Sequence, residues 1–366
     1  MNPSHKISLV KFAPKNKAGF FDTLKERIDV YFKENNIEMH GNNSMWWKTV
    51  AMVAIYLAPY LVMVTGLTSG SLLLFYGMWL LMGIGMIGIG CSVMHDSNHD
   101  SYSGNKSLNK FMSKIIILVG GYDVNWRIQH NILHHTYTNI EGLDHDLEAG
   151  ILLRFSPAQK KYGFHKYQHW YAWFLYGLLT INWVVKKDFT QAVKYDRMGL
   201  LKKERLTLRQ AMRQVVFSKI FYIGITIVLP ILFSGVAWYH IILGFLMMHF
   251  IGGLALSCIF QLAHILEECE FPEPTDARKM DNSWAIHQML NTANFAPKSK
   301  IMNWFIGGLN RQIEHHLFPY ICHVHYKKLA PIVKTTAQEF GVPYYEQKTF
   351  MSALVEHGRM LKKLGK

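Results

Sequence analysis

Two long stretches without a charged residue dominate the pattern of hydrophobic and polar positions along this 366-residue chain. Residues 49–94 and 220–266 contain no Asp, Glu, Lys or Arg. At about 1.5 Å per residue, each stretch is roughly 70 Å of helix, enough for two crossings of a hydrocarbon core about 30 Å thick. Turn-forming residues lie near the middle of each stretch, at 66–71 and 230–235. The pattern predicts four transmembrane helices in two hairpins, at about 49–65, 72–93, 220–233 and 237–262.

The composition favours an all-α integral membrane protein over a soluble protein with long buried helices. Charged residues make up 17% of the chain, below the roughly 25% of soluble domains. The 39 Lys and Arg lie outside both uncharged stretches, so the positive-inside rule predicts that both termini and the middle segment are cytoplasmic. In a bacterium this would be the inner membrane. The net charge of +14 suits anionic lipid headgroups, and without a nucleic-acid-binding motif no nucleic-acid partner is expected.

The segments outside the predicted crossings divide the chain into three parts. Residues 1–44 are expected to be cytoplasmic, with a basic arm at 1–15 and an amphipathic helix at Phe20–Glu34. This helix either docks on the soluble face of the protein or lies on the membrane. Residues 45–350 are expected to form the membrane domain with a cytoplasmic helical cap, and residues 351–366 a C-terminal tail.

Two apolar segments between the second and third crossings are shorter than a crossing. Residues 111–121 and 170–185 therefore predict interfacial or re-entrant helices. If the second of these were a true crossing, the C-terminal segment would lie on the opposite side of the membrane.

Gly83, Gly85 and Gly88 match the G-x-G-x-x-G pattern of a dinucleotide-binding turn. No predicted strand precedes them, and they lie inside an uncharged apolar stretch. These glycines are instead expected to let a neighbouring helix approach closely.

Histidines form three clusters beside the predicted crossings, spaced H-x-x-x-H, H-x-x-x-H-H and H-H, and a further histidine follows the fourth crossing. Residues four apart share one face of a helix, and neutral imidazole is the commonest metal ligand. One surface histidine needs no explanation, but this repeated clustering predicts a shared metal site. The candidate ligands are His95, His99, His130, His134, His135, His264, His315 and His316.

Eight imidazoles suit two metal ions better than one, because a zinc ion takes three or four ligands. The four cysteines form no C-x-x-C pair, which disfavours structural zinc and iron–sulfur clusters. The paired Glu-x-x-His helices of soluble di-iron carboxylate proteins are also missing. A histidine-rich pair of irons that activates oxygen is the best fit. Four flanking acids are expected to accept the second ring N–H of the imidazoles: Asp96, Asp144, Asp146 and Glu314.

These motifs resemble those of the membrane fatty acid desaturases, especially the front-end acyl desaturases. The resemblance is most specific at residues 312–319, Gln-Ile-Glu-His-His-Leu-Phe-Pro, where Gln312 stands in the place of the first histidine of H-x-x-H-H. It includes residues 144–146 and 261–264 and covers roughly residues 45–350. The middle cluster departs from the usual H-x-x-H-H of this group, and its longer spacing also resembles the membrane alkane hydroxylases.

The resemblance implies a four-helix membrane anchor, two iron ions (Fe2+/Fe3+), and use of O2 to introduce a cis double bond into a fatty acyl chain. The eight histidines are then metal ligands, and Gln312 is a weaker candidate that either binds metal or holds a metal-bound water. The acyl carrier stays open between acyl-CoA, acyl-ACP and an acyl lipid. The His-Pro-Gly-Gly motif of a fused cytochrome b5 domain does not occur in the sequence. A separate ferredoxin- or cytochrome b5-like electron donor, with its reductase, is therefore expected.

Two other functions are compatible with the sequence. A di-iron hydroxylase shares the chemistry but leaves an alcohol on the chain. A membrane metal transporter or metal-binding protein belongs to another class, but transporters place their ligands near the bilayer midplane, whereas these clusters follow the crossings. His249 does fall within the fourth crossing, and we expect it to make a hydrogen-bonded contact between helices.

Overall fold

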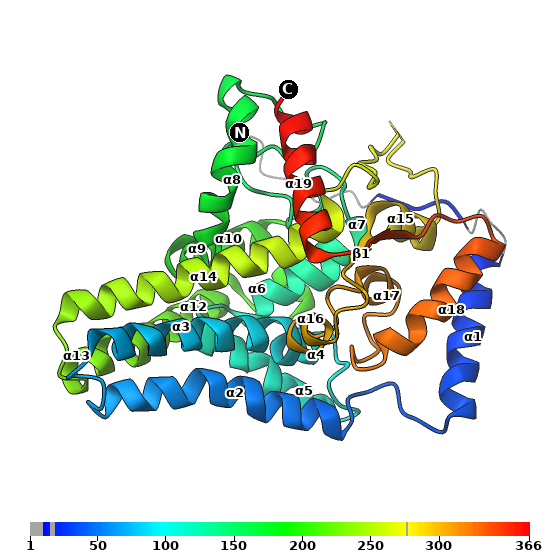
Figure 1. The fold of residues 1–366 in the computed structure, drawn as a ribbon. Helices are drawn as coiled ribbons and strands as arrows, with labels where there is room; N and C mark the ends of the chain where they lie inside the picture. The colour runs from blue at the N-terminus through cyan, green and yellow to red at the C-terminus, as the bar shows by residue number, and fades with distance from the viewer. Residues whose placement is uncertain (1–9, 15–18, 276) are drawn as a thin grey trace.

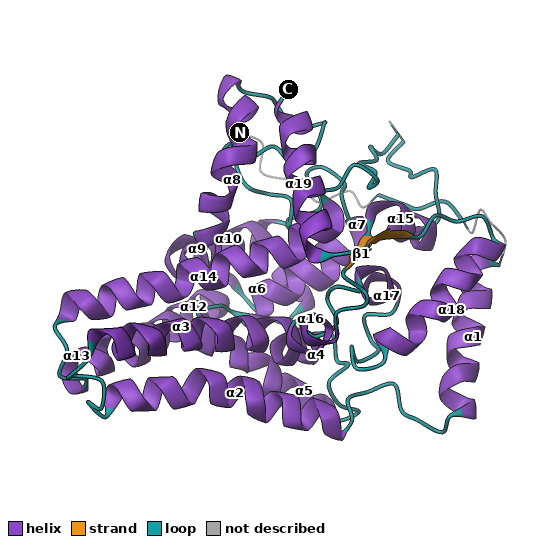
Figure 2. Cartoon of the chain, viewed as in Figure 1, coloured by secondary structure: helices purple, strands orange, loops and turns teal. Residues whose placement is uncertain are grey.

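A computed structural model describes residues 10–14, 19–275 and 277–366, and these residues are mostly helical (Figure 1, Figure 2). Of the predicted basic arm at 1–15, only residues 10–14 are described. One short parallel sheet pairs β1 (Ala293–Phe295) with β2 (Tyr345–Gln347). The predicted all-α class is therefore correct in its main feature.

Four helical segments of the described chain are long and apolar enough to cross a bilayer. The first is α2 (Asn43–Val64), and the fourth is α14 (Trp238–His264). The second joins α3 (Leu72–Gly88), the π-helical η1 (Ile89–Met94) and α4 (His95–Asn98). The third joins α12 (Leu208–Ile223), the π-helical η6 (Gly224–Val228) and α13 (Leu229–Phe233). This third segment begins earlier than the predicted 220 because Thr207 and Gln210 form a capping box ahead of the apolar run.

Glycines bring the second long segment close to its neighbours. A Cβ on Gly85 would lie 2.6 Å from the backbone nitrogen of Tyr56 in α2. A Cβ on Gly83 would lie 3.3 Å from the backbone oxygen of Met248 in α14. Because no side chain fits at 85 without moving backbone, the glycine pattern serves helix packing, as predicted. Figure 1 shows α2, α3 and α14 running side by side.

His249 makes the predicted contact between helices. Its Nε2 lies 2.8 Å from the hydroxyl of Tyr222 in α12, and its Nδ1 lies 3.0 Å from the hydroxyl of Thr180. Both ring nitrogens are thereby satisfied inside the apolar bundle, which fixes α14 against two neighbouring segments.

Short helical pieces fill the chain between the second and third long segments. They are α5 (Lys106–Ser113), the 3-10 helix η2 (Lys114–Val119), α6 (Asp123–Arg127), the π-helical η3 (Ile128–His134), α7 (His135–Tyr137), the 3-10 helix η4 (Gly163–Tyr167), α8 (Gln168–Gly177), α9 (Leu179–Asn182), the π-helical η5 (Trp183–Lys187), α10 (Asp188–Arg197) and α11 (Leu200–Lys203). The predicted helix at 111–121 is divided between α5 and η2. The one at 170–185 is interrupted at Leu178 and is not among the helices able to span.

The amphipathic helix predicted at the N-terminus is α1 (Phe20–Glu34), and it docks on the rest of the chain. Its buried stripe includes Leu24 and Ile28 and packs on α18 (Tyr326–Glu339), as Figure 1 shows. We call the C-terminal helices the cap. They are α15 (Trp284–Asn291), α16 (Lys300–Phe305), α17 (Gln312–Leu317), α18 and α19 (Phe350–Gly365).

Candidate metal centre

The eight predicted histidines meet at one end of the long helices, beneath the cap. α4 and the residue after it supply His95 and His99; η3 and α7 supply His130, His134 and His135; the end of α14 supplies His264; and α17 supplies His315 and His316. All of them are buried except His99, which is partly exposed. The π-helical turns η1 and η3 lie directly before or within two of these clusters, and such turns are frequent at functional sites because they redirect side chains.

The histidines form two groups with the geometry of metal ligands. Within each group, one ring nitrogen of every member lies within 4.8 Å of those of the others. The first group is His95, His99, His130 and His315, and the second is His134, His264 and His316.

His135 lies between the two groups. Its ring centroid is 4.5 Å from that of His315 in the first group and 4.5 Å from that of His316 in the second. Its Nε2 is 3.2 Å from Nε2 of His130, which is itself 3.3 Å from Nε2 of His95. Two nitrogens bound to one cation at about 2.1 Å lie roughly 3.0–3.5 Å apart, so these spacings fit shared coordination.

Two of the acids named from the sequence contact ring nitrogens of the central cluster that point away from the centre, here called the outer nitrogens. Asp144 lies 3.0 Å from Nδ1 of His134, and Asp146 lies 3.3 Å from Nδ1 of His130. Asp146 also lies 3.6 Å from Nδ1 of His134, so one carboxylate faces a histidine of each group. Carboxylates in these positions fix which ring nitrogen faces inward.

Neutral acceptors hold the outer nitrogens of the remaining clusters. Nδ1 of His264 lies 3.1 Å from the backbone oxygen of Asn291. Nδ1 of His316 lies 2.8 Å from Oε1 of Gln288, and Nδ1 of His315 lies 3.1 Å from the hydroxyl of Tyr326. The sequence had not singled out these partners. Gln288 and Asn291 are three residues apart in α15, a spacing that puts both on one helix face, but nothing in the sequence links that face to histidines.

Three ring nitrogens on the opposite side of these rings, here called the inward nitrogens, have no hydrogen-bond partner among the described residues. Metal ligands are expected to show this feature, because their free nitrogen faces the ion. Nε2 of His264, His315 and His316 is buried and has no hydrogen bond within the described part of the chain. A buried polar atom without a partner costs about 1–3 kcal/mol. Repetition of that cost around one centre, with the outer nitrogens of the same three rings hydrogen-bonded, fits a site built for cations.

Burial and mutual repulsion keep several of these imidazoles neutral. Burial first, and neighbouring imidazoles second, hold the pKa of His135, His315 and His316 well below its usual range. His134 differs, because Asp144 and Asp146 outweigh its burial and raise its pKa to about 9. Neutral imidazole is the form that binds metal, so a metal at His134 must displace a proton.

Asp96 and Glu314 depart from the pattern of the other two acids. Asp96 lies 3.6 Å from Nδ1 of His95, but it makes a shorter contact of 2.7 Å with Nδ1 of His323. The expectation for Glu314 is corrected: its carboxylate accepts hydrogen bonds from Asn294 at 2.9 Å and from Tyr344 at 2.8 Å. Both donors come from residues outside the histidine cluster.

Gln312 is buried at the start of α17, one helical turn before His315 and His316. Its amide nitrogen has no hydrogen-bond partner among the described residues. The structure thus places Gln312 on the same short helix as two of the candidate ligands, with one amide hydrogen-bonding atom unused in the described chain.

A small crevice lies among the short helices, beside Trp126, whose ring packs on His130. Its lining is Ile116, Gly121, Tyr122, Trp126, Gln129, Trp183, Asp188 and Gln191. The ring of Trp126 lies 4.4 Å from that of His130, and Gln129 donates to Asp146 and accepts from Gln191. The two helices beside the crevice, η2 and η5, belong to the segments predicted to lie at the membrane surface.

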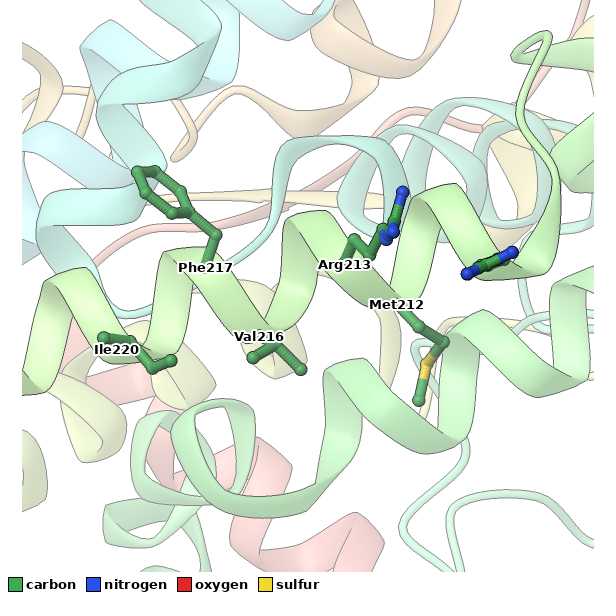
Figure 3. Close-up of a pocket in the computed structure, with 6 residues that line it drawn as sticks. Met212, Arg213, Val216, Phe217 and Ile220 are labelled. Atoms are coloured by element: carbon green, nitrogen blue, oxygen red, sulfur yellow. The ribbon is translucent and has the colours of Figure 1, made fainter.

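A second, shallow hollow lies on the outer face of α12 (Figure 3). Arg209 and Arg213 line one end, and exposed apolar side chains such as Phe217 and Ile220 line the other. This order of charged and then apolar residues is typical of a helix that enters a bilayer at headgroup level. We therefore assign it to the lipid-facing surface.

Comparison with known proteins agrees with these features. The fatty acid desaturase family model matches residues 69–348. The chain is 33% identical over 346 residues to a sn-1 linoleoyl-lipid 6-desaturase of Arthrospira platensis, covering 94% of this chain and 92% of the relative. A protein of the same name from Synechocystis sp. is 34% identical over 360 residues, 98% of each chain. An acyl-lipid (8-3)-desaturase of Physcomitrium patens is 33% identical, covering 98% of this chain and 74% of the relative. The chain therefore belongs to the fatty acid desaturase family.

Proposed function

We propose that this chain is a membrane-bound front-end desaturase that introduces a cis double bond into an acyl chain carried by a membrane lipid. The observation that carries the proposal is the pair of histidine groups with metal-ligand spacing, in which Nε2 of His264, His315 and His316 is buried without a partner in the described chain while Nδ1 of the same rings is hydrogen-bonded. The relatives named above act on acyl groups of lipids, which favours a lipid over acyl-CoA or acyl-ACP as the carrier.

Two iron ions are proposed as the cofactor, one for each group of histidines. His95, His99, His130 and His315 would hold the first, and His134, His264 and His316 the second, with His135 between them. Gln312 would stand beside the centre as a weak ligand or a holder of water. When bound, the irons supply the oxygen chemistry needed to take hydrogen from an unactivated methylene. In the overall reaction, O2, two electrons and two protons convert one –CH2–CH2– unit to –CH=CH– and two waters.

The protein's own contribution would be burial and alignment. Most of the histidine cluster is buried beneath the cap. In such a site less solvent has to rearrange around the reacting groups, and the substrate can be held in a reactive orientation. We propose that the acyl chain approaches past Trp126 by widening the small crevice among the short helices, because Trp126 lines this crevice and packs its ring on His130. Its aromatic walls suit an apolar chain, and its amide groups suit an ester.

The proposed topology has two membrane hairpins, with the cap and both termini in the cytoplasm. Its support is that His95 and His264 end the second and fourth long segments and meet in one cluster. The Lys and Arg residues flank the long segments, which favours the cytoplasm for that side. A separate ferredoxin- or cytochrome b5-like protein, with its reductase, would deliver electrons there.

The comparisons favour desaturation over the two alternatives. The named relatives are desaturases, and none of those cited is a hydroxylase or a transporter. The position of the histidines at the helix ends also differs from the midplane sites of transporters.

Expression in a host that lacks polyunsaturated lipids tests the proposal, with fatty acids of each isolated lipid class mapped by mass spectrometry. New double bonds on lipid-bound chains are the expected result, and an alcohol would favour hydroxylation. His130→Ala, His264→Ala and His316→Ala should each abolish turnover and lower bound iron. His240→Ala is the matched control, because His240 contacts Tyr76 near the opposite end of α14 and should leave both unchanged.

A further inference from the structure

A buried chain of polar side chains runs from α2 to His95, behind the histidine cluster. Nδ1 of His323 lies 2.7 Å from Oδ2 of Asp96, and Nε2 of His323 lies 2.6 Å from Nζ of Lys48. Asp96 and His323 are each 1% exposed, and Lys48 is 3% exposed. The proposed function so far assigns no role to Lys48 or His323.

The donors around Asp96 converge on one of its two oxygens. The His323 ring, the backbone N–H of His323 at 3.2 Å and the thiol of Cys322 at 3.0 Å all point to Oδ2. The other oxygen, Oδ1, lies 3.6 Å from Nδ1 of His95. That nitrogen has no hydrogen bond elsewhere in the described chain. Oδ1 is therefore free to accept the outer N–H of His95 when the opposite ring nitrogen faces a metal.

The charges along this chain balance if the Asp96 carboxylate and the Lys48 ammonium are charged and the His323 ring between them is neutral and protonated on Nδ1. In that tautomer Nδ1–H donates to Asp96, and Nε2 accepts a hydrogen bond from the Lys48 ammonium. A carboxylate as buried as Asp96 is costly without a compensating charge. Lys48, in the first long helix, supplies that positive charge, and the His323 imidazole lies between it and Asp96 at the end of the second.

Asp96, Cys322 and His323 also lie close enough together to suggest a third metal site. The hydrogen bonds argue against one. Three donors already occupy Oδ2 of Asp96, and the Lys48 ammonium occupies the free face of the His323 ring. A cation there would lie beside a positive charge.

We infer that His323 and Lys48 are positioning residues of the metal centre, which orient Asp96 and balance its charge so that Asp96 fixes the inward-facing nitrogen of His95. The inference rests on the proposed function, in which His95 is a metal ligand. With Lys48, the residues that support the metal centre include one from α2, a helix that supplies none of the candidate metal ligands. Outer partners of metal-bound histidines typically change metal affinity by about 10–100-fold.

Iron binding by the purified full-length protein tests the inference, with ferrous iron titrated under anaerobic conditions and the bound iron examined by Mössbauer spectroscopy. His323→Phe removes both hydrogen bonds and should weaken binding about 10–100-fold. His323→Gln can still donate to Asp96 and accept from Lys48, so it should stay within about threefold of the wild type. Lys48→Met should weaken binding in the same direction, and the double variant Lys48→Met/His323→Phe should lose less than the sum of the two effects.

His325→Ala is the matched control. His325 is buried two residues further along the same loop, and its Nε2 lies 3.0 Å from the backbone oxygen of His40. It should leave the iron affinity and the Mössbauer spectrum unchanged. Wild-type affinity in both His323→Phe and Lys48→Met, or equal losses in His323→Phe and His325→Ala, would overturn the inference. Iron binding by a wild-type protein that forms no double bond would instead count against the proposed function and leave the inference standing.

Discussion

Replacing Asp144 by asparagine should weaken metal binding at the second histidine group. Asp144 is 1% exposed, and its carboxylate lies 3.0 Å from Nδ1 of His134. Asparagine keeps the size of the side chain but removes the charge that holds the outer N–H of His134. Loss of such a partner typically lowers metal affinity by about 10–100-fold, which is about 1.4–2.8 kcal/mol.

The same substitution should also destabilise the metal-free protein. The two oxygens of Asp144 each accept a backbone N–H at 2.9 Å, one from Asn139 and one from Asp146. Asparagine offers a single oxygen, so one of these buried donors would face an amide N–H and lose its partner. An unpaired buried donor costs about 1–3 kcal/mol, which thermal unfolding of the metal-free variant would detect.

Anaerobic iron titration of wild type, Asp144→Asn and a control variant provides the assay. Asp123→Asn is a suitable control, because Asp123 pairs with Arg127 at 2.9 Å rather than with a histidine. The effect of Asp144→Asn should also vanish in a His134→Ala background, since the aspartate acts through that ring. Wild-type affinity in Asp144→Asn, or an undiminished effect without His134, would refute the reasoning.

Three further predictions follow from other parts of the molecule. Gly85→Ala should lower stability by about 1–3 kcal/mol through overpacking against α2, whereas Gly70→Ala, with open space around it, should not, and thermal unfolding compares them. Burial raises the pKa of Glu314 from 4.5 to about 7. Between these two pH values the folded metal-free protein holds a proton on Glu314 that the unfolded chain has lost, so the contribution of Glu314 to stability should fall by about 3 kcal/mol as pH rises from about 4.5 to about 7. The difference in unfolding free energy between wild type and Glu314→Gln, measured across that range, should change by this amount. Gln191→Trp should fill the crevice and reduce double-bond formation with unchanged iron content, which product analysis and iron assay together would check.

The sequence alone determined the long helices and the types of residue at the centre. Charge-free runs such as 49–94 can be recognised directly because the cost of burying charge in a bilayer applies to each residue separately. The amphipathic stripe that includes Leu24 and Ile28 predicted the bounds of α1 because helical periodicity depends on neighbours a few residues apart. The spacing of His130 and His134 likewise placed both rings on one side of a helical turn.

Only the tertiary structure decided which neutral groups contact the outer nitrogens of His264, His315 and His316, and which side chains contact Asp96 and Glu314. Glu314 is adjacent to His315, yet its hydroxyl donor is Tyr344, and Lys48 meets His323 across 275 positions of sequence. A hydrogen-bond partner is chosen by where separate segments cross in space, and sequence spacing fixes geometry only within one helix. Local pattern was therefore enough to predict the candidate ligands, whereas the groups that contact their outer nitrogens depend on how the cap packs against the ends of the long helices.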